Sequence, residues 1–175
     1  ATVPNGFAPC AYRVPATGIY YVKIGKYYWS EGTPGNYELH VERVRGIQQE
    51  YDPEYYNARG LDYANVLTLK AEGTHRTATV AGSIMEGGDV DLYNLGVFNA
   101  GNAVELTTQR PADGTVVPKL TLLNAAGQVI LDTDGTPSDG QLKATLSSDG
   151  AVYARIEATS GGGSRGPYLL KGDVT

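Results

Sequence analysis

The feature of this chain that most constrains its fold is an alternation of apolar and polar residues, broken by turn residues at short intervals. Successive side chains of a strand point to opposite faces, so the alternation predicts strands with one buried and one exposed face. Many short strands of this kind are typical of an all-β sandwich or barrel. The strands expected in the second part of the chain are 66–70, 77–84, 89–98, 103–109, 117–123, 128–131, 141–146, 151–158 and 167–174.

The breaks between the expected strands contain residues that favour turns. Examples are residues 113–114 (DG), 124–127 (NAAG) and 134–135 (DG), where glycine allows positive φ and Asp or Asn can bond to the nearby backbone. Glycine occurs 23 times and tyrosine 13 times, which favours short strands and tight turns over long helices. The residues expected to be buried are Tyr93, Leu95, Leu120, Leu122, Leu146, Tyr153, Ile156, Tyr168 and Leu170.

An internal repeat organises the chain. Residues 16–24 (ATGIYYVKI) align with residues 148–156 (SDGAVYARI), and residues 35–37 (GNY) align with residues 166–168 (GPY). Both copies place a glycine-containing loop between the two matched segments. The beginning of the chain therefore resembles its end.

Three segments follow from the repeat. Residues 1–44 correspond to the closing strands of one unit, residues 45–64 are a polar, Tyr-rich linker, and residues 65–175 are a complete second unit. A unit without its first strands cannot close a sandwich, and its exposed edges invite pairing with another strand. The linker, the second unit or another chain must therefore cover residues 11–44.

Two strands are expected in the partial unit, with Ile19, Tyr21, Leu39 and Val41 as side chains available for burial. Burying an apolar side chain of this size contributes roughly 1.5–3 kcal/mol, so leaving several exposed is unfavourable. We expect these strands to pair across a chain or domain boundary.

Four motifs occur in order in the second unit: residues 82–95 (GSIMEGGDVDLYNL), 120–127 (LTLLNAAG), 149–156 (DGAVYARI) and 166–170 (GPYLL). Their order and spacing resemble the bacterial pre-peptidase C-terminal (PPC) domain family. The resemblance implies a jelly-roll-like antiparallel β-sandwich without catalytic activity, found beside catalytic domains of secreted hydrolases and in large surface proteins. The collagen-binding domains of clostridial collagenases look similar and bind calcium.

Two acidic residues, Asp89 and Asp91, lie at the start of an expected strand and share one face. Their carboxylate oxygens could hold a hard cation such as Ca²⁺. The resemblance implies further ligands from the segment before the domain, where Asp62 and Asn65 lie. The alternative is a pair of solvated acids that form a turn.

An aromatic run is the candidate binding surface. Flat aromatic side chains can fill a protein interface, stack on a sugar or pack under a loop. The single cysteine has no partner within the chain, so it is a small buried residue or forms an intermolecular disulfide. The interface residues that we expect are Cys10, Tyr27, Tyr28, Trp29, Tyr37 and Leu39.

Composition and motifs argue against several function classes. A net charge of −5 gives no basic field for nucleic acid or anionic lipid. The apolar runs are too short to insert in a membrane. The two histidines, His40 on a wet strand face and His75 in a polar turn, belong to no known nucleophile or metal motif. We therefore expect no enzymatic activity.

Two functions remain compatible with the sequence. The first is an extracellular structural or assembly module whose copies complete one another's sandwiches by strand addition, giving a surface polymer or filament. The second is a spacer, or a calcium-dependent carbohydrate- or collagen-binding module, beside neighbouring domains of a secreted hydrolase or adhesin. The start at Ala1, without a charged-then-apolar leader, indicates a processed chain or an excised fragment, and we interpret it as a mature secreted chain.

Overall fold

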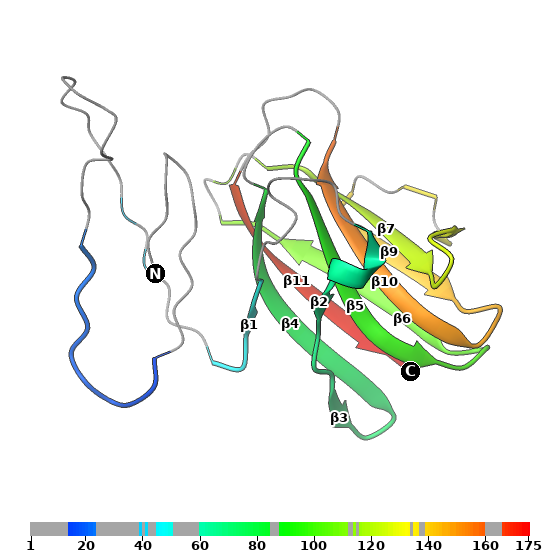
Figure 1. Cartoon of the computed structure of the whole chain (residues 1–175), viewed down its shortest axis with the longest axis horizontal. Coiled ribbons are helices and arrows are strands. Elements are labelled where there is room, and N and C mark those ends of the chain that lie inside the picture. Colours follow the sequence, from blue (N-terminus) through cyan, green and yellow to red (C-terminus); the bar gives the residue numbers. More distant parts are fainter. Residues whose placement is uncertain are drawn as a thin grey trace.

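Two β-sheets pack face to face in the computed structural model of this chain (Figure 1). The structure describes residues 14–23, 39, 41, 45–50, 60–84, 88–111, 114, 116–133, 135–136, 139–159 and 166–175.

The first sheet, sheet A, has the strand order β1-β4-β11-β6-β9, and β3 pairs with the start of β4. The second, sheet B, has the order β2-β5-β10-β7-β8. All described pairings are antiparallel except β1 with β4 and β2 with β5, which are parallel. The prediction of an all-β sandwich is confirmed. The bounds are β1 Gln48–Gln49, β2 Asn65–Val66, β3 Lys70–Glu72, β4 His75–Ile84, β5 Val90–Phe98, β6 Ala103–Gln109, β7 Pro118–Asn124, β8 Val129–Ile130, β9 Gln141–Thr145, β10 Gly150–Ala158 and β11 Gly166–Val174.

The alternation in the sequence locates most of these strands. Every expected strand from residue 77 onward is present, with its ends within two residues of the prediction. The expected strand 66–70 is wrong, because β2 ends at Val66 and the chain then crosses from sheet B to sheet A before β3. Leu67 is buried and Leu69 packs against the core during this crossing, which explains the apolar pattern there. One 3-10 turn, η1 (Leu61–Tyr63), precedes β2, and no helix in the described part is long and apolar enough to span a membrane.

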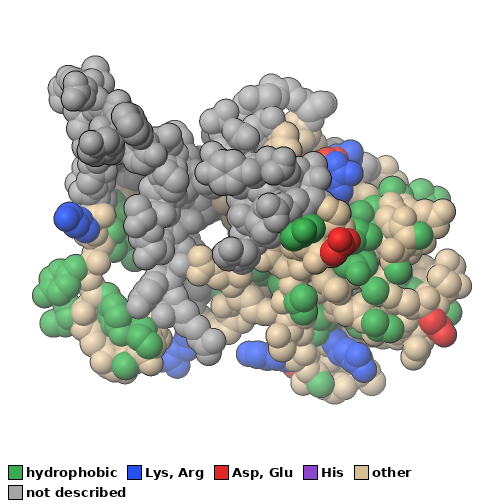
Figure 2. All heavy atoms as spheres, in the orientation of Figure 1, with side chains coloured by type: hydrophobic (Ala, Val, Ile, Leu, Met, Phe, Trp, Pro, Cys, Tyr) green, Lys and Arg blue, Asp and Glu red, His purple; other side chains and the backbone are tan. Residues whose placement is uncertain are grey.

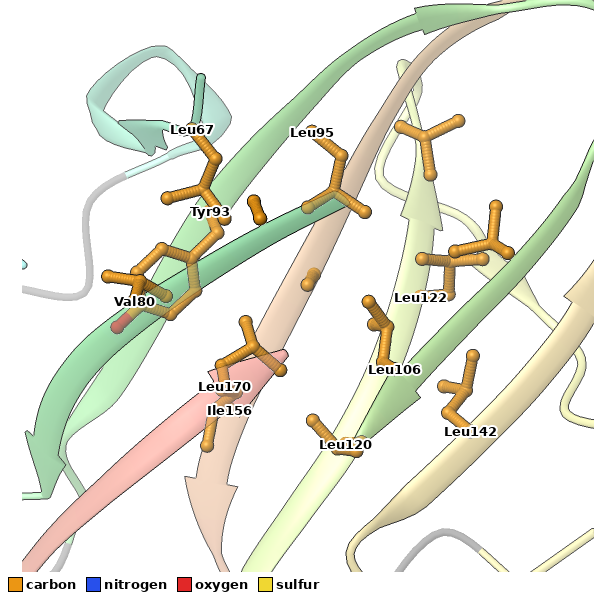
Figure 3. Packing of buried hydrophobic residues seen from close by; sticks show 14 of the residues in the cluster. Leu67, Val80, Tyr93, Leu95, Leu106, Leu120, Leu122, Leu142, Ile156 and Leu170 are labelled. Atoms are coloured by element: carbon orange, nitrogen blue, oxygen red, sulfur yellow. The ribbon is translucent and has the colours of Figure 1, made fainter. Parts of the chain in front are cut away.

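The core lies between the two sheets, and β10 and β11 supply its middle (Figure 3). Eight of the nine residues predicted to be buried are buried, and Tyr153 is half-buried. Tyr153 and Ile156 are three positions apart, so alternation cannot place both on one face. The inward positions of β10 belong instead to Val152, Ala154 and Ile156.

Part of the predicted linker joins the sandwich as β1. Gln48 lies opposite Val80, and the Glu50 backbone N–H donates to Ala81 O at 3.0 Å. The Gln48 side chain also bonds both backbone groups of Thr68, at 2.8 and 3.0 Å. A pair of glutamines has no apolar alternation, so the sequence pattern did not indicate this strand. The boundaries 1–44, 45–64 and 65–175 themselves stay predictions.

Residues 14–23 lie apart from the sandwich and form no strand in the structure (blue in Figure 1). Ile19 is 83% exposed and Tyr21 is 89% exposed. Leu39 and Val41, from the second strand expected in this region, are 50% and 71% exposed. Figure 2 shows hydrophobic side chains gathered on the surface of the 14–23 segment. Pairing of this region across a chain boundary stays a prediction.

The inward face of β10 can be tested by truncating one side chain on each face of the strand. Ile156→Ala should lower the free energy of unfolding by about 2–5 kcal/mol, because it removes buried apolar surface and leaves a cavity. Tyr153→Ala should cost clearly less, since that side chain is half-exposed. Urea unfolding measures both losses, and equal losses would contradict the assignment of the inward face.

Candidate functional site

Four polar side chains gather between the sheets where β1 pairs with β4. Asp91 and Tyr93 alternate inward on β5, Tyr168 points inward from β11, and Glu50 follows β1. Asp91 and Tyr93 are 0% exposed and Tyr168 is 1% exposed, whereas Glu50 is half-buried. The cluster therefore joins both sheets to the segment that precedes them.

Hydrogen bonds connect the members of this acid–tyrosine cluster. The Tyr168 hydroxyl donates to Asp91 Oδ2 in a short contact. The hydroxyl oxygens of Tyr93 and Tyr168 lie 2.8 Å apart, and the Tyr93 hydroxyl lies 3.1 Å from Glu50 Oε1. The backbone N–H of Ser83 donates to Glu50 Oε2 at 2.9 Å. Glu50 thus links β1 to β4 and to the interior of the sandwich.

Proton positions in the cluster follow from its electrostatics. Burial raises the pKa of Asp91 well above its usual value, and the charge of Glu50, a hydrogen bond to Glu50 and the charge of Asp89 raise it further. Burial also raises the pKa of Tyr93 and of Tyr168, so both hydroxyls keep their protons.

Counting protons shows why a carboxyl group in this cluster must stay neutral. Three hydrogen-bonded contacts join Glu50 to Tyr93, Tyr93 to Tyr168 and Tyr168 to Asp91. Each of these contacts needs one proton, and the two hydroxyls supply two. Two ionised carboxylates would leave a contact without a proton and place like charges together in a dry interior. The three contacts therefore require at least one carboxyl proton.

Glycine at position 82 leaves the space that the two hydroxyls occupy. A Cβ atom there would lie 2.5 Å from the Tyr168 hydroxyl oxygen and closer still to that of Tyr93. Any larger residue must displace both tyrosines or the β4 backbone. Gly82 opens the first of the four sequence motifs, so the motif marks a packing requirement in this chain.

The residues proposed to bind calcium lie in different settings in the structure. Asp89 is 6% exposed and Asp91 is fully buried, so the alternative of two solvated turn acids is wrong. The Asn65 side chain donates to Leu92 O at 3.4 Å, and Asp62 is exposed in η1. Among the described residues, no group of three or more His, Cys, Asp or Glu is placed to hold a metal ion. Calcium binding, and with it the calcium-dependent binding of carbohydrate or collagen, stays a prediction.

Most of the proposed interface residues lie outside the described part of the chain: Cys10, Tyr27, Tyr28, Trp29 and Tyr37. Leu39 is described and is half-exposed. Their role in an interface therefore stays a prediction.

His75 differs from its predicted setting, because it begins β4 and does not lie in a turn. Its Nδ1 lies 2.8 Å from Asp173 Oδ2 at the surface, where an ion pair contributes little to stability. His40 lies outside the described residues.

A groove of about 360 Å³ opens where residues 67–69 cross between the sheets. Leu67, Leu69 and Val97 line it, and the Arg76 guanidinium lies 6.0 Å from the centre of the Phe98 ring beside it. The described lining brings no acid and base side chains together.

Comparison with known proteins gives matches in structure but none in sequence. No protein-family model matches the chain, and no curated protein matches it in sequence. Solved structures with a similar chain path include periplasmic inhibitors of g-type lysozyme (PliG). The protein from Aeromonas hydrophila is 18% identical with a TM-score of 0.45, and that from Salmonella Typhimurium is 15% identical with a TM-score of 0.46. Each comparison covers 64% of this chain and 99% of the other. Similarity of this size gives no basis for transferring a function.

The neutral carboxyl group predicts a dependence of stability on pH. Because the pKa of Asp91 is higher in the folded chain than its usual value of 3.8, the folded state binds more protons between these two values. Stability should therefore fall as pH rises above about 4, by about 1.4 kcal/mol per pH unit within that window. Asp91→Asn should weaken this fall, since an amide has no proton to lose.

Urea unfolding at pH 4, 5.5 and 7 measures this effect. Asp62→Asn is the matched control at an exposed acid and should keep the dependence of the unsubstituted chain. Glu50 and Asp89 also face Asp91, so a residual dependence is expected in the Asp91 variant. An unchanged slope in Asp91→Asn would contradict the neutral carboxyl.

A second prediction concerns the space beside the hydroxyls. Gly82→Ala should lower the free energy of unfolding by about 1–3 kcal/mol, because the added methyl group overlaps both tyrosines. Gly60→Ala is the control, since its φ is −73° and its Cβ would make an ordinary 3.4 Å contact. Thermal unfolding compares the two, and a neutral Gly82→Ala would show that the hydroxyls do not need this space.

Proposed function

We propose that this chain is a non-catalytic extracellular structural module that associates with other polypeptides by β-strand pairing of its N-terminal segment. The observation that supports this proposal is the exposure of apolar residues in a segment whose composition is typical of a strand. Ile19, Tyr21 and Val22 are 83%, 89% and 64% exposed, whereas the sandwich has a well-filled core.

The exposed segment has the chemistry that strand addition requires. β-branched and aromatic residues such as Ile19, Tyr20, Tyr21 and Val22 fit a pleated, half-buried surface. Main-chain hydrogen bonds would supply affinity and alternate side chains would supply specificity. A contact of this kind repeated head to tail would give a filament unless the chains closed into a ring.

The extracellular location and the lack of catalysis form part of the same proposal. Both rest on the resemblance of residues 82–95 and the three later motifs to PPC domains. The described part of the sandwich is consistent with a structural role, since Asp91, Tyr93 and Tyr168 are buried and connect strands in the interior.

The experiment compares the intact chain with a variant that lacks residues 1–44. The intact chain should associate with increasing concentration, because its apolar segment has no cover, and the shortened variant should be a folded monomer. Size-exclusion chromatography with light scattering measures the mass, electron microscopy detects polymers, and far-UV circular dichroism checks that the sandwich is retained.

The design keeps β1 and Glu50 in the shortened variant, so the acid–tyrosine cluster is unchanged. An intact chain that stays monomeric throughout the concentration range would contradict the proposal. Association that survives the deletion would also contradict it, because the contact would then lie elsewhere.

A further inference from the structure

We infer that the N-terminal segment supplies the counterparts of β10 and β11 to a second sandwich, and that the partner is a related sandwich unit with smaller core side chains. This inference rests on the proposed function, which states that the segment pairs with another polypeptide. It adds the register of that pairing and the chemistry of the partner.

The repeat aligns the first segment with β10, and the burial of β10 in the structure then assigns an inward face to that segment. Tyr20 and Val22 align with Val152 and Ala154, which are 3% and 0% exposed in the core. In the isolated chain Tyr20 and Val22 are 45% and 64% exposed. The side chains that enter a core are therefore Tyr20 and Val22.

A charged residue supports this register independently. Lys23 aligns with Arg155, a half-exposed residue that pairs with Glu157 on the outer face of β10. Turning Ile19 and Tyr21 inward would turn Lys23 inward as well, and burying an unpaired ammonium group is costly. We therefore replace the expectation that Ile19 and Tyr21 are buried: the opposite face of the strand, with Tyr20 and Val22, points inward.

The second segment follows the same rule. Leu39 aligns with Leu170, which is 1% exposed, and Val41 aligns with the buried Gly172. His40 between them aligns with Lys171, which is exposed. The apolar and polar positions of this segment thus match the inward and outward positions of β11.

Glycines at the strand starts provide a further match. Gly150 and Gly166 begin β10 and β11 with φ values of 148° and 140°, a region that side chains rarely occupy. Gly18 and Gly35 stand at the aligned positions. The segment therefore keeps the backbone freedom that these two strand starts need.

Side-chain size identifies the partner. Tyr20, Val22 and Val41 are each larger than the residue that they align with, namely Val, Ala and Gly. At Gly172, a Cβ would already lie 3.3 Å from a Leu106 methyl group. Extra volume in a filled core is destabilising, so an identical copy of this sandwich is a weaker receptor than a fitting partner, and association between identical copies requires high concentration. The fitting partner is a sandwich of the same type, without its last two strands and with smaller residues opposite these positions.

The test places the segments in the sandwich of the intact chain. In the in-register graft, residues 148–156 take the sequence of residues 16–24, and residues 166–173 take that of residues 35–42. This graft includes Val152→Tyr, Ala154→Val and Gly172→Val. A second graft is identical but keeps Val152, Ala154 and Gly172. A third, shifted graft takes its sequences one residue later in the chain, which exchanges the inward and outward faces.

Urea unfolding followed by circular dichroism measures all three grafts. The graft with the native core residues should unfold cooperatively, the full in-register graft should have a lower midpoint, and the shifted graft should have no cooperative transition. Loss of folding in the graft with native core residues, or equal stability of the shifted graft, would overturn the strand assignment. A full graft with the native midpoint would overturn the claim of a non-identical partner and make a second copy the partner. These outcomes are independent of whether the intact chain associates, so failure here is distinct from failure of the proposed function.

Discussion

The packing of β10 against β11 is the interaction on which the rest of this fold depends. Each strand lies at the centre of its own sheet, β10 between β5 and β7 and β11 between β4 and β6. Their inward side chains, Ile156 and Leu170 among them, are buried in the core between the two sheets. Because β10 and β11 come last in the chain, neither sheet can close until the whole sandwich sequence is present. This order gives the C-terminal strands unusual importance for stability.

The acid–tyrosine cluster sets a second constraint on the same interface. An apolar core tolerates small shifts between sheets, whereas a chain of hydrogen bonds from Tyr93 through Tyr168 to Asp91 requires one relative position. The cost of burying Asp91 is reduced because its raised pKa extends the pH range in which the carboxyl is neutral. Glu50 extends this chain of hydrogen bonds from outside the predicted domain, so the sandwich uses a residue that the repeat assigns to the linker.

The sequence predicted the parts of the fold that depend on alternation and missed the parts that depend on polar contacts. Strands from β4 to β11 have one apolar face, which the period of two reveals. β1 was not predicted because Gln48 pairs through its backbone and its side-chain amide, and the strand has no apolar face. The shared face of Asp89 and Asp91 was evident from spacing, but their burial was not, since spacing alone does not show whether a carboxyl is neutral. Glu50 could be found only from the fold, because it is distant in sequence from every residue that it contacts in the cluster.

The short connection between the N-terminal segment and β1 bears on how successive sandwiches would be arranged. If Val41 ends the counterpart of β11, its Cα lies at most about 25 Å from that of Gln48, even in a fully extended chain. Gln48 is itself fixed to β4 and to Thr68, so the connection is tied to the second sandwich at its end. A second sandwich completed by the N-terminal segment would therefore lie close to the first and have little freedom to move away. Closely spaced units with short connections form a stiff array, which suits a structural role better than independent binding modules on a long flexible linker would.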